Sequence, residues 1–180
     1  MRIKIPVFIF RGAFSKIFLE LDLKRKIKPG INLEKFLKKY YNKIEVKKVY
    51  SPYIPSLSSS YKISKEIITE SYEQFLNEIK ILKSLNHPNI IKMKNHSSGT
   101  QPFISSYIYE GVLESLIKNS QFNCDEILLI CYTIINVIEY LHNKNIGHFD
   151  LSIRNIYYDF ISMNVFIGDF GLSRHFSHKS

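Results

Sequence analysis

The chain has 180 residues, of which 45% are hydrophobic and 14% aromatic, so it can bury the core of one domain or two small lobes. This composition excludes a chain that is disordered throughout. The formal net charge is +9, and residues 1–60 account for it with 14 Lys and Arg against 4 Asp and Glu. We interpret this basic third as a solvated, lysine-rich surface and expect no nucleic-acid partner. Binding to nucleic acid or to an anionic surface is the less favoured alternative.

No targeting segment or zinc-binding pattern is evident in the sequence. Residues 5–10, IPVFIF, are too short for the core of a signal peptide or for a membrane span, which predicts a cytoplasmic protein without a membrane span. Cys124 and Cys131 are the only cysteines and lack the CxxC or Cys/His spacing of a zinc site. We expect both to be free, buried thiols in a reducing compartment.

The first 60 residues are predicted to contain strands and one helix. Residues 5–20 read as a strand, a turn and a second strand. A charged run with a Pro-Gly turn follows, and then helical spacing of apolar residues over 32–41. Residues 43–50 alternate in the manner of a strand, and 51–60 form a loop rich in Pro and Ser.

The rest of the chain is expected to be mainly helical, with short strands. Helices are predicted at 67–85, 111–119 and 125–143, and strands at 90–93, 103–108, 156–158 and 164–169. The helix at 125–143 is apolar nearly all round, so we expect it to be buried on several sides. This order of elements predicts an α+β protein with a strand-rich first lobe, a helical second lobe and a cleft between them.

Two short stretches carry side chains suited to phosphate chemistry. HFDLSIRN places Asp150 and Asn155 on one loop, and GDFG places Asp169 beside a glycine at the end of a predicted strand. Mg²⁺ prefers hard oxygen ligands such as carboxylate and amide oxygens. A carboxylate can also orient an attacking hydroxyl group, which phosphoryl transfer requires together with metal ions and a dry site. The pattern therefore favours phosphoryl transfer.

The segment LHNKNIGHFDLSIRNIYYD, followed by VFIGDFGLSR, resembles the catalytic core of a eukaryotic protein kinase of the tyrosine-kinase-like or Ser/Thr type. It is similar to the HRDLxxxN loop and the DFG motif of that family. The resemblance implies transfer of a phosphoryl group from ATP, with Mg²⁺, to a Ser/Thr or Tyr hydroxyl of a protein substrate. It implies that Asp150 is catalytic and that Asn155 and Asp169 hold the metal. The alternative is a kinase-like module that binds nucleotide or protein without catalysis.

The resemblance extends upstream along the chain. FLNEIKILKSLNHPNIIKM resembles the small-lobe helix with its ion-pairing glutamate, which maps to Glu78. Residues 105–108 fall at the hinge between the lobes, and FRGAFSKIFL falls at the phosphate-covering loop, where only Gly12 keeps a family glycine. The nucleotide-binding residues that the resemblance implies are Gly12, Ser15, Ile17, Lys47, Ser106 and Ile108.

Two positions are candidates for the lysine that pairs with Glu78 and contacts the phosphates. IEVKKV resembles the family's VAIK and points to Lys47, which we prefer as the catalytic lysine. SSYK offers Lys62 instead, which lies 16 residues before Glu78 rather than 31. The resemblance implies a first lobe at 1–104 with an insertion around 22–66, a hinge at 105–108 and a partial second lobe at 109–180.

The sequence also departs from the family pattern in the HRD motif and after the DFG motif. Phe149 replaces the Arg of HRD, which in many kinases pairs with a phosphorylated activation segment, so this switch is not expected here. The chain ends at Ser180, nine residues after Gly171, before the APE segment and the helices that follow it in the family. We therefore expect a helical lobe truncated shortly after the DFG motif, with a partner chain covering the apolar helix at 125–143.

Overall fold

The computed structural model describes residues 3–11, 15–23, 44–50, 65–99, 101–109, 111–119, 122–159 and 164–176. The chain divides into two compact units. The first unit comprises Met1–Phe75 and Met93–Ile108, and the second comprises Leu76–Lys92 and Tyr109–Ser180. The helix predicted at 32–41 and the loop at 51–60 lie outside the described residues, as do Gly12 and Lys62.

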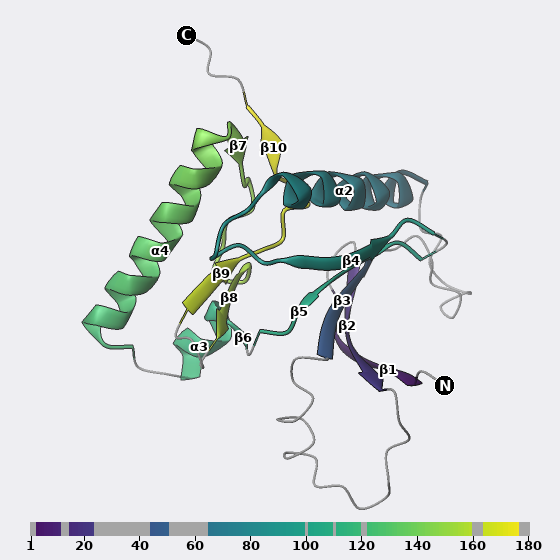
Figure 1. Ribbon diagram of the computed structural model, residues 1–180, viewed down its shortest axis with the longest axis horizontal. Helices are drawn as coiled ribbons and strands as arrows, with labels where there is room; N and C mark the ends of the chain where they lie inside the picture. Colours follow the sequence, from purple (N-terminus) through teal and green to yellow (C-terminus); the bar gives the residue numbers. More distant parts are fainter. Residues whose placement is uncertain are drawn as a thin grey trace, which may run out of the picture. The chain divides into compact units, whose positions relative to one another are not determined.

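A five-stranded antiparallel sheet forms the first unit, in the order β1-β2-β3-β5-β4 (Figure 1). Its strands are β1 (Ile3–Arg11), β2 (Ser15–Leu23), β3 (Ile44–Tyr50), β4 (Met93–Ser97) and β5 (Phe103–Tyr107). The strands predicted within 5–20 and at 43–50 and 103–108 are confirmed. The strand predicted at 90–93 is wrong, because β4 begins only at Met93. The Ile91 N–H instead donates to the carbonyl oxygen of Ile167 at 3.0 Å.

The two faces of this sheet differ in chemistry, and β3 shows the difference most clearly. The ring of Tyr50 packs against Phe75 of helix α2 (Lys65–Ser84), with 5.3 Å between the ring centroids. Side chains alternate along a strand, so Ile44, Val46 and Lys48 share the face of Tyr50. Glu45 and Lys47 take the opposite face, where they form ion pairs with Lys94 at 3.1 Å and Glu20 at 3.2 Å.

Helix α2 contributes to both units. Its buried side chains are Ser71 and Phe75 in the first unit and Glu78, Ile79, Ile81 and Leu82 in the second. The helix ends before the sequence NHPN, because proline disfavours helical geometry in the residue that precedes it. The HPN turn that follows is closed by the Ile90 N–H, which donates to the carbonyl oxygen of His87 at 3.3 Å. The helix predicted at 67–85 is thus confirmed.

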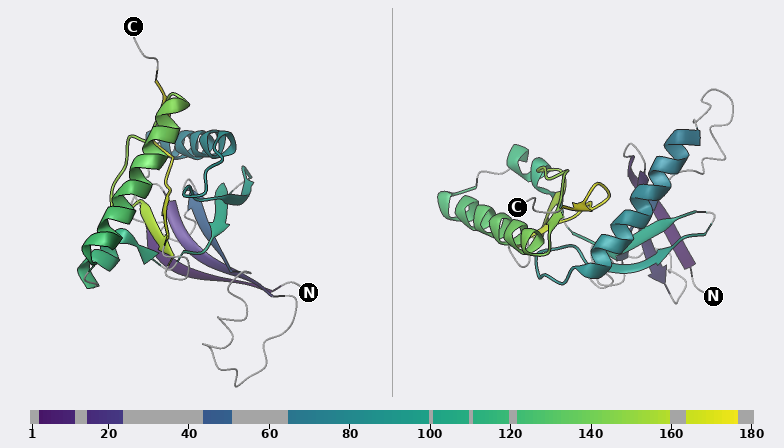
Figure 2. Two further views of the ribbon diagram at one scale, coloured as in Figure 1. Left: turned by 60° about the vertical axis from the view of Figure 1, so that its left-hand side comes forward. Right: turned by 90° about the horizontal axis from the view of Figure 1, so that it is seen from above.

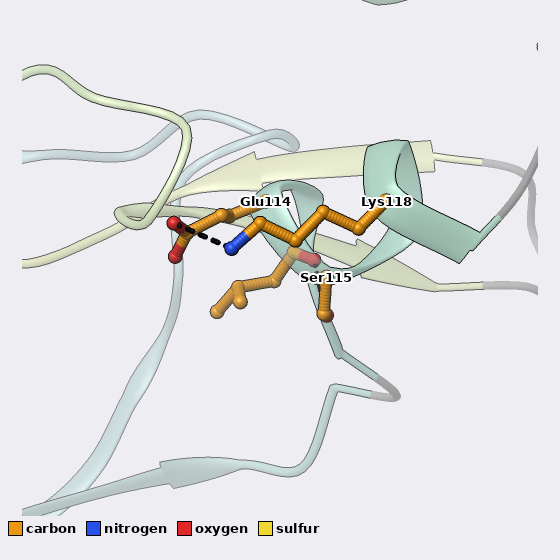
Figure 3. A network of polar contacts seen from close by, with 4 residues as sticks. Glu114, Ser115 and Lys118 are labelled. Carbon is orange, nitrogen blue, oxygen red and sulfur yellow. Dashed lines mark hydrogen bonds and ion pairs between the residues drawn. The ribbon is translucent and has the colours of Figure 1, made fainter.

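The second unit combines helices with two small sheets. Its long helix is drawn in green in Figure 2. Its remaining elements are α3 (Leu113–Asn119), α4 (Cys124–Asn143), a three-stranded sheet of β6 (Gly111–Val112), β8 (Ile156–Asp159) and β9 (Asn164–Ile167), and a pair formed by β7 (Ile146–Gly147) and β10 (Arg174–His175). In α3, Lys118 forms an ion pair with Glu114 at 3.2 Å (Figure 3). The Ser115 hydroxyl donates to the Val112 carbonyl at 2.8 Å. The predicted helices at 111–119 and 125–143 and the strands of the hairpin are confirmed within a few residues.

Helix α4 begins at a capping box. The Glu126 N–H donates to the Asn123 side chain, and the Asn123 N–H donates to the Glu126 carboxylate, each at 2.9 Å. The helix packs against β7 and β9, and its buried residues are Val137 and Leu141. Farther along, the Tyr140 hydroxyl accepts from the Asn86 N–H at 2.7 Å, which ties the helix to the turn after α2.

The outer face of α4 corrects two predictions from the sequence. The helix is not buried on several sides by the described residues, since Leu128 is 65% and Ile135 61% exposed. Cys124 and Cys131 are free thiols, as expected, but both are exposed on this helix rather than buried. An open hollow of about 320 Å³ lies here, lined by Ile135, Ile138, Glu139, His142 and Asn143. Among the described residues, no helix is both long enough and apolar enough to cross a membrane.

The α+β class predicted from the sequence is confirmed, with a strand-rich first unit and a partly helical second unit. The first unit ends at Ile108, the last residue of the stretch predicted as a hinge. The second unit also takes in Leu76–Lys92, which the sequence interpretation placed in the first lobe. Long-range hydrogen bonds from this segment explain the grouping: the Asn89 side chain, for example, donates to the Val165 carbonyl at 2.9 Å.

Candidate active site

The loop between β7 and β8 brings together the two polar residues that the sequence singled out. The Asn155 amide nitrogen donates to the Asp150 carboxylate at 3.0 Å and to the Asp150 carbonyl at 2.8 Å. A turn closed by the Asn155 N–H on the Ser152 carbonyl at 2.9 Å makes this contact possible across five residues. The loop is also attached to α3, because the Glu114 N–H donates to the Ile153 carbonyl at 3.1 Å. Asp150 is exposed, and Asn155 is half-buried.

A second contact joins this loop to the end of β9. The Gly168 N–H donates to the Asn155 carbonyl at 3.0 Å, and Asp169 follows directly. Gly168 is needed here because a Cβ atom at this position would lie 2.8 Å from side-chain atoms of both Ile91 and Tyr157. Asp169 has a left-handed backbone with φ 61°, a conformation that costs a non-glycine residue about 1–3 kcal/mol and is common at functional sites. The two polar stretches are therefore assembled around Asn155.

His148 is the buried link between the two stretches. Its Nε2 lies 3.0 Å from the Gly168 carbonyl oxygen, and its Nδ1 accepts from the Asp150 N–H at 3.3 Å. A carbonyl only accepts hydrogen bonds, so Nε2 carries the proton and the ring is neutral. Burial lowers the pKa of His148, and this effect outweighs the Gly168 carbonyl and the nearby carboxylates, which favour the charged ring. The ring also packs on the buried Phe170, with centroids 4.8 Å apart.

The segment after Asp169 is held to α2 by a residue that the sequence interpretation missed. The Asn77 amide nitrogen donates to the carbonyls of Ser173 at 2.6 Å and Gly171 at 3.0 Å, and lies 3.5 Å from that of Phe170. The predicted ion-pairing residue, Glu78, is next in the helix and is buried, with 2% of its surface exposed. A signal was present in FLNE, where a polar amide precedes the glutamate, but nothing in the sequence identified its partners almost 100 residues away.

The nucleotide-binding residues predicted in the first unit lie on β2, β3 and the end of β5. Ser15 begins β2 and is buried, and Ile17 pairs with Lys48 on the apolar face of the sheet. The Ser106 hydroxyl donates to the Tyr107 carbonyl at 3.2 Å, and Ile108 is the last residue of the unit. Gly12 lies outside the described residues. Their role in nucleotide binding stays a prediction.

The lysines of β3 point to opposite faces of the sheet. Lys47 lies on the charged face, paired with Glu20 at 3.2 Å and placed over the Phe103 ring with 3.8 Å to the centroid. Lys48 lies on the apolar face, with its ammonium 5.0 Å from the centroid of the Tyr50 ring. Because Tyr50 packs on α2, Lys48 is the β3 lysine on the α2 side of the sheet. The resemblance to VAIK aligns the family's lysine with Lys47, so that pattern contains no signal for Lys48.

A strand-rich unit precedes the loop that carries Asp150 and Asn155, and a DFG segment at the end of β9 is bonded to that loop. This arrangement is typical of a phosphoryl-transfer class of protein. Comparison with protein families identifies which one. The family model described as protein kinase domain matches residues 57–180, more than half of the chain. The chain therefore belongs to the protein kinase family, whose members are transferases that generally use ATP and Mg²⁺.

Relatives among curated proteins agree with this assignment. The chain is 31% identical over 121 residues to a probable myosin light chain kinase of Dictyostelium discoideum, covering 65% of the chain and 25% of that protein. It is 33% identical over 110 residues to a probable serine/threonine-protein kinase of the same organism, covering 57% of the chain and 7% of that protein. The chain thus spans a quarter or less of the length of these relatives.

Proposed function

We propose that this chain is the part of a protein kinase that binds Mg·ATP and directs its γ-phosphoryl group to a protein hydroxyl. The observation that carries the proposal is the assembly around Asn155: its side chain bonds to Asp150, while its carbonyl accepts from Gly168 beside Asp169. Membership in the kinase family supports the same reading. The name of one relative favours a Ser or Thr acceptor over Tyr.

Asp150 is the residue that receives the substrate hydroxyl. Its carboxylate is exposed, and the amide nitrogen of Asn155 holds one of its oxygens at 3.0 Å. The carboxylate therefore accepts a hydrogen bond from the incoming hydroxyl and orients its oxygen for attack.

The donor atoms of Asn155 and Asp169 fit a magnesium ion. The Asn155 amide nitrogen is engaged by Asp150, so the amide oxygen is the atom that Asn155 can offer to a metal. Asp169 adds a carboxylate at the end of β9, and hard oxygen atoms of these two kinds are the ligands that Mg²⁺ prefers. When bound, Mg²⁺ neutralises charge on the phosphate oxygens. The left-handed backbone at Asp169 fixes the direction in which its side chain leaves the main chain.

Three lysines compete for the role of the cation that contacts the phosphates. Lys47 was preferred from the sequence, but its ion pair with Glu20 occupies it on the charged face of the sheet. Lys48 shares the face of Tyr50, on the side of α2. Lys62 alone lies within the residues that the family model matches, and we rank it first on that ground. Replacing each lysine singly by Met, and measuring Mg·ATP affinity, assigns the role to the lysine whose loss weakens binding most.

Thermal unfolding with and without Mg·ATP tests nucleotide binding directly. At a ligand concentration 100 times the dissociation constant, binding stabilises the folded chain by about 2.7 kcal/mol. Asp169→Ala is expected to abolish this stabilisation, and Asp125→Asn, at an exposed position in the first turn of α4, to preserve it. Stabilisation without phosphoryl transfer supports the alternative of a non-catalytic kinase-like module. No stabilisation at all contradicts both the proposed kinase and a non-catalytic module that binds nucleotide.

The exposed apolar face of α4 supports the prediction that a partner chain covers this helix. Leu128, Tyr132 and Ile135 are each more than 60% exposed in the part of the chain that the structure describes. Such a run of large apolar side chains is typical of a surface that another segment or chain covers. That a partner chain covers this face, and that the protein lies in the cytoplasm, stay predictions.

A further inference from the structure

Phe149, which stands where the family has the Arg of HRD, makes contacts that its place in the sequence does not explain. It is 57% exposed, yet it has a left-handed backbone with φ 61°. For a bulky residue this conformation is an outlier that other contacts must stabilise. The guanidinium of Arg174 lies over its ring, 4.7 Å from the centroid.

The same ring also lies against the backbone of Gly147. A Cβ atom at position 147 would fall 2.5 Å from the Cε2 atom of the Phe149 ring and 2.8 Å from its Cζ atom, closer than side chains approach. Gly147 and Arg174 are themselves direct partners in the pairing of β7 with β10. The ring of Phe149 thus contacts both members of one cross-strand pair.

This strand pair is the connection between the catalytic loop and the segment after the DFG motif. It has only two residues in each strand, which is too short to be stable in isolation. Two further hydrogen bonds flank it: the Ser173 hydroxyl donates to the His148 carbonyl at 3.1 Å, and the Phe176 N–H donates to the Asn145 carbonyl at 2.9 Å. The ring of Phe149 covers the pair between these bonds.

We propose that Phe149 is a positioning residue whose ring holds Arg174, and with it the segment after Gly171, against the loop that presents Asp150. The contact is between a ring and a cation, so it needs no phosphate or other anion to form. An arginine at position 149 would instead place two guanidinium groups side by side, which repel each other unless an anion lies between them. The effect of Phe149 on catalysis through Asp150 rests on the proposed kinase function. The contact that holds Arg174 and the segment after Gly171 does not.

Hydrogen exchange of the full chain, without nucleotide, tests this role through the amides of Arg174 and Phe176. Opposite residues of an antiparallel pair exchange hydrogen bonds at every second position, and the Phe176 N–H donates to the Asn145 carbonyl, so Arg174 is the other β10 residue whose N–H faces β7. Phe149→Asn removes the ring but keeps a residue that tolerates a left-handed backbone. We expect about fivefold faster exchange of these amides, which corresponds to the strength of an exposed cation–aromatic contact. Phe149→Tyr, which keeps the ring, is expected to restore protection. Equal protection in the Asn variant and the unsubstituted chain would overturn the proposal.

A double-mutant cycle separates the ring contact from general damage. Gly147→Ala is expected to speed exchange, because the new methyl group collides with the ring of Phe149. In the Phe149→Asn background the same substitution is expected to add little, since the ring is gone. Additive effects of the two substitutions would contradict the proposal.

The third arm uses inorganic phosphate as the probe. Protection of the unsubstituted chain is expected to be the same with and without phosphate, whereas Phe149→Arg is expected to lose protection and to regain it when phosphate is added. Protection that depends on phosphate in the unsubstituted chain would overturn the proposal. If the chain transfers phosphoryl groups, Phe149→Asn is expected to lower kcat with little change in the KM for ATP. A chain that fails to bind Mg·ATP would contradict the proposed function without altering these exchange results.

Discussion

The most informative single substitution is Asn77→Asp. It changes one amide NH₂ group of α2 into a carboxylate oxygen and leaves the size of the side chain unchanged. In the structure that amide nitrogen donates to the carbonyls of Ser173 at 2.6 Å and Gly171 at 3.0 Å. A carboxylate only accepts hydrogen bonds, so the variant would point an anion at carbonyl oxygens that also only accept.

The size of the effect follows from these contacts. Each hydrogen bond contributes a net of about 0.5–1.5 kcal/mol, so losing two bonds in Asn77→Ala is expected to cost about 1–3 kcal/mol. In Asn77→Asp the partly buried acceptors also face a charge with no donor between them, which adds about 1–3 kcal/mol. The Asp variant is therefore expected to lose roughly twice as much free energy of unfolding as the Ala variant.

Urea unfolding of the full chain, with hydrogen exchange over 170–173, measures this effect. The matched control is Asn95→Asp, at an exposed asparagine of β4, which is expected to change stability by less than about 0.5 kcal/mol. If Asn77→Asp were no less stable than Asn77→Ala, or if exchange over 170–173 were unchanged, the proposed attachment of α2 to the DFG segment would be refuted.

Three further predictions follow from the second unit. Burial lowers the pKa of His148, so as the pH falls below 6.5 the unfolded chain takes up a proton that the folded chain does not. Stability is therefore lost below that pH. His148→Gln is expected to reduce this loss, as measured by urea unfolding at several pH values. The control variant His142→Gln, at an exposed position, is not expected to reduce it. Gly168→Ala is expected to lower the free energy of unfolding by about 1–3 kcal/mol, because the added Cβ would lie too close to neighbouring side chains. Gly111→Ala is expected to be nearly neutral in the same assay, because the nearest atom to its added Cβ would be 3.6 Å away. We also expect the exposed apolar face of α4 to cause self-association of the chain. Ile135→Lys is then expected to shift sedimentation toward the monomer with a stability change below about 0.5 kcal/mol, and unchanged sedimentation would contradict this expectation.

Features that depend on short-range spacing could be predicted from the sequence. The contact between Asp150 and Asn155 spans five residues within one loop, and the start of α4 follows from the pairing of Asn123 with Glu126. Strand alternation and helical periodicity likewise act over a few residues, which is why most elements of the fold were found to within a few positions.

Features that depend on distant partners could not be predicted in the same way. The face taken by Lys47 depends on strand phase, and a shift of one residue moves every side chain to the other face of the sheet. The role of Asn77 depends on carbonyls 94 and 96 residues away. The exposure of Ile135 depends on what packs against α4, and an apolar pattern alone does not reveal whether its partner is present.

Kinase activity is measured by the transfer of labelled phosphate from ATP to a peptide library with Ser, Thr and Tyr acceptors. We expect transfer by the unsubstituted chain and by Asp125→Asn. In Asp150→Asn we expect a loss of roughly 100-fold or more, because the group that orients the hydroxyl is removed. Stabilisation by Mg·ATP is expected to survive in that variant, since Asn155 and Asp169 remain. Transfer that is undiminished in Asp150→Asn, or that is lacking in the unsubstituted chain, would contradict the account.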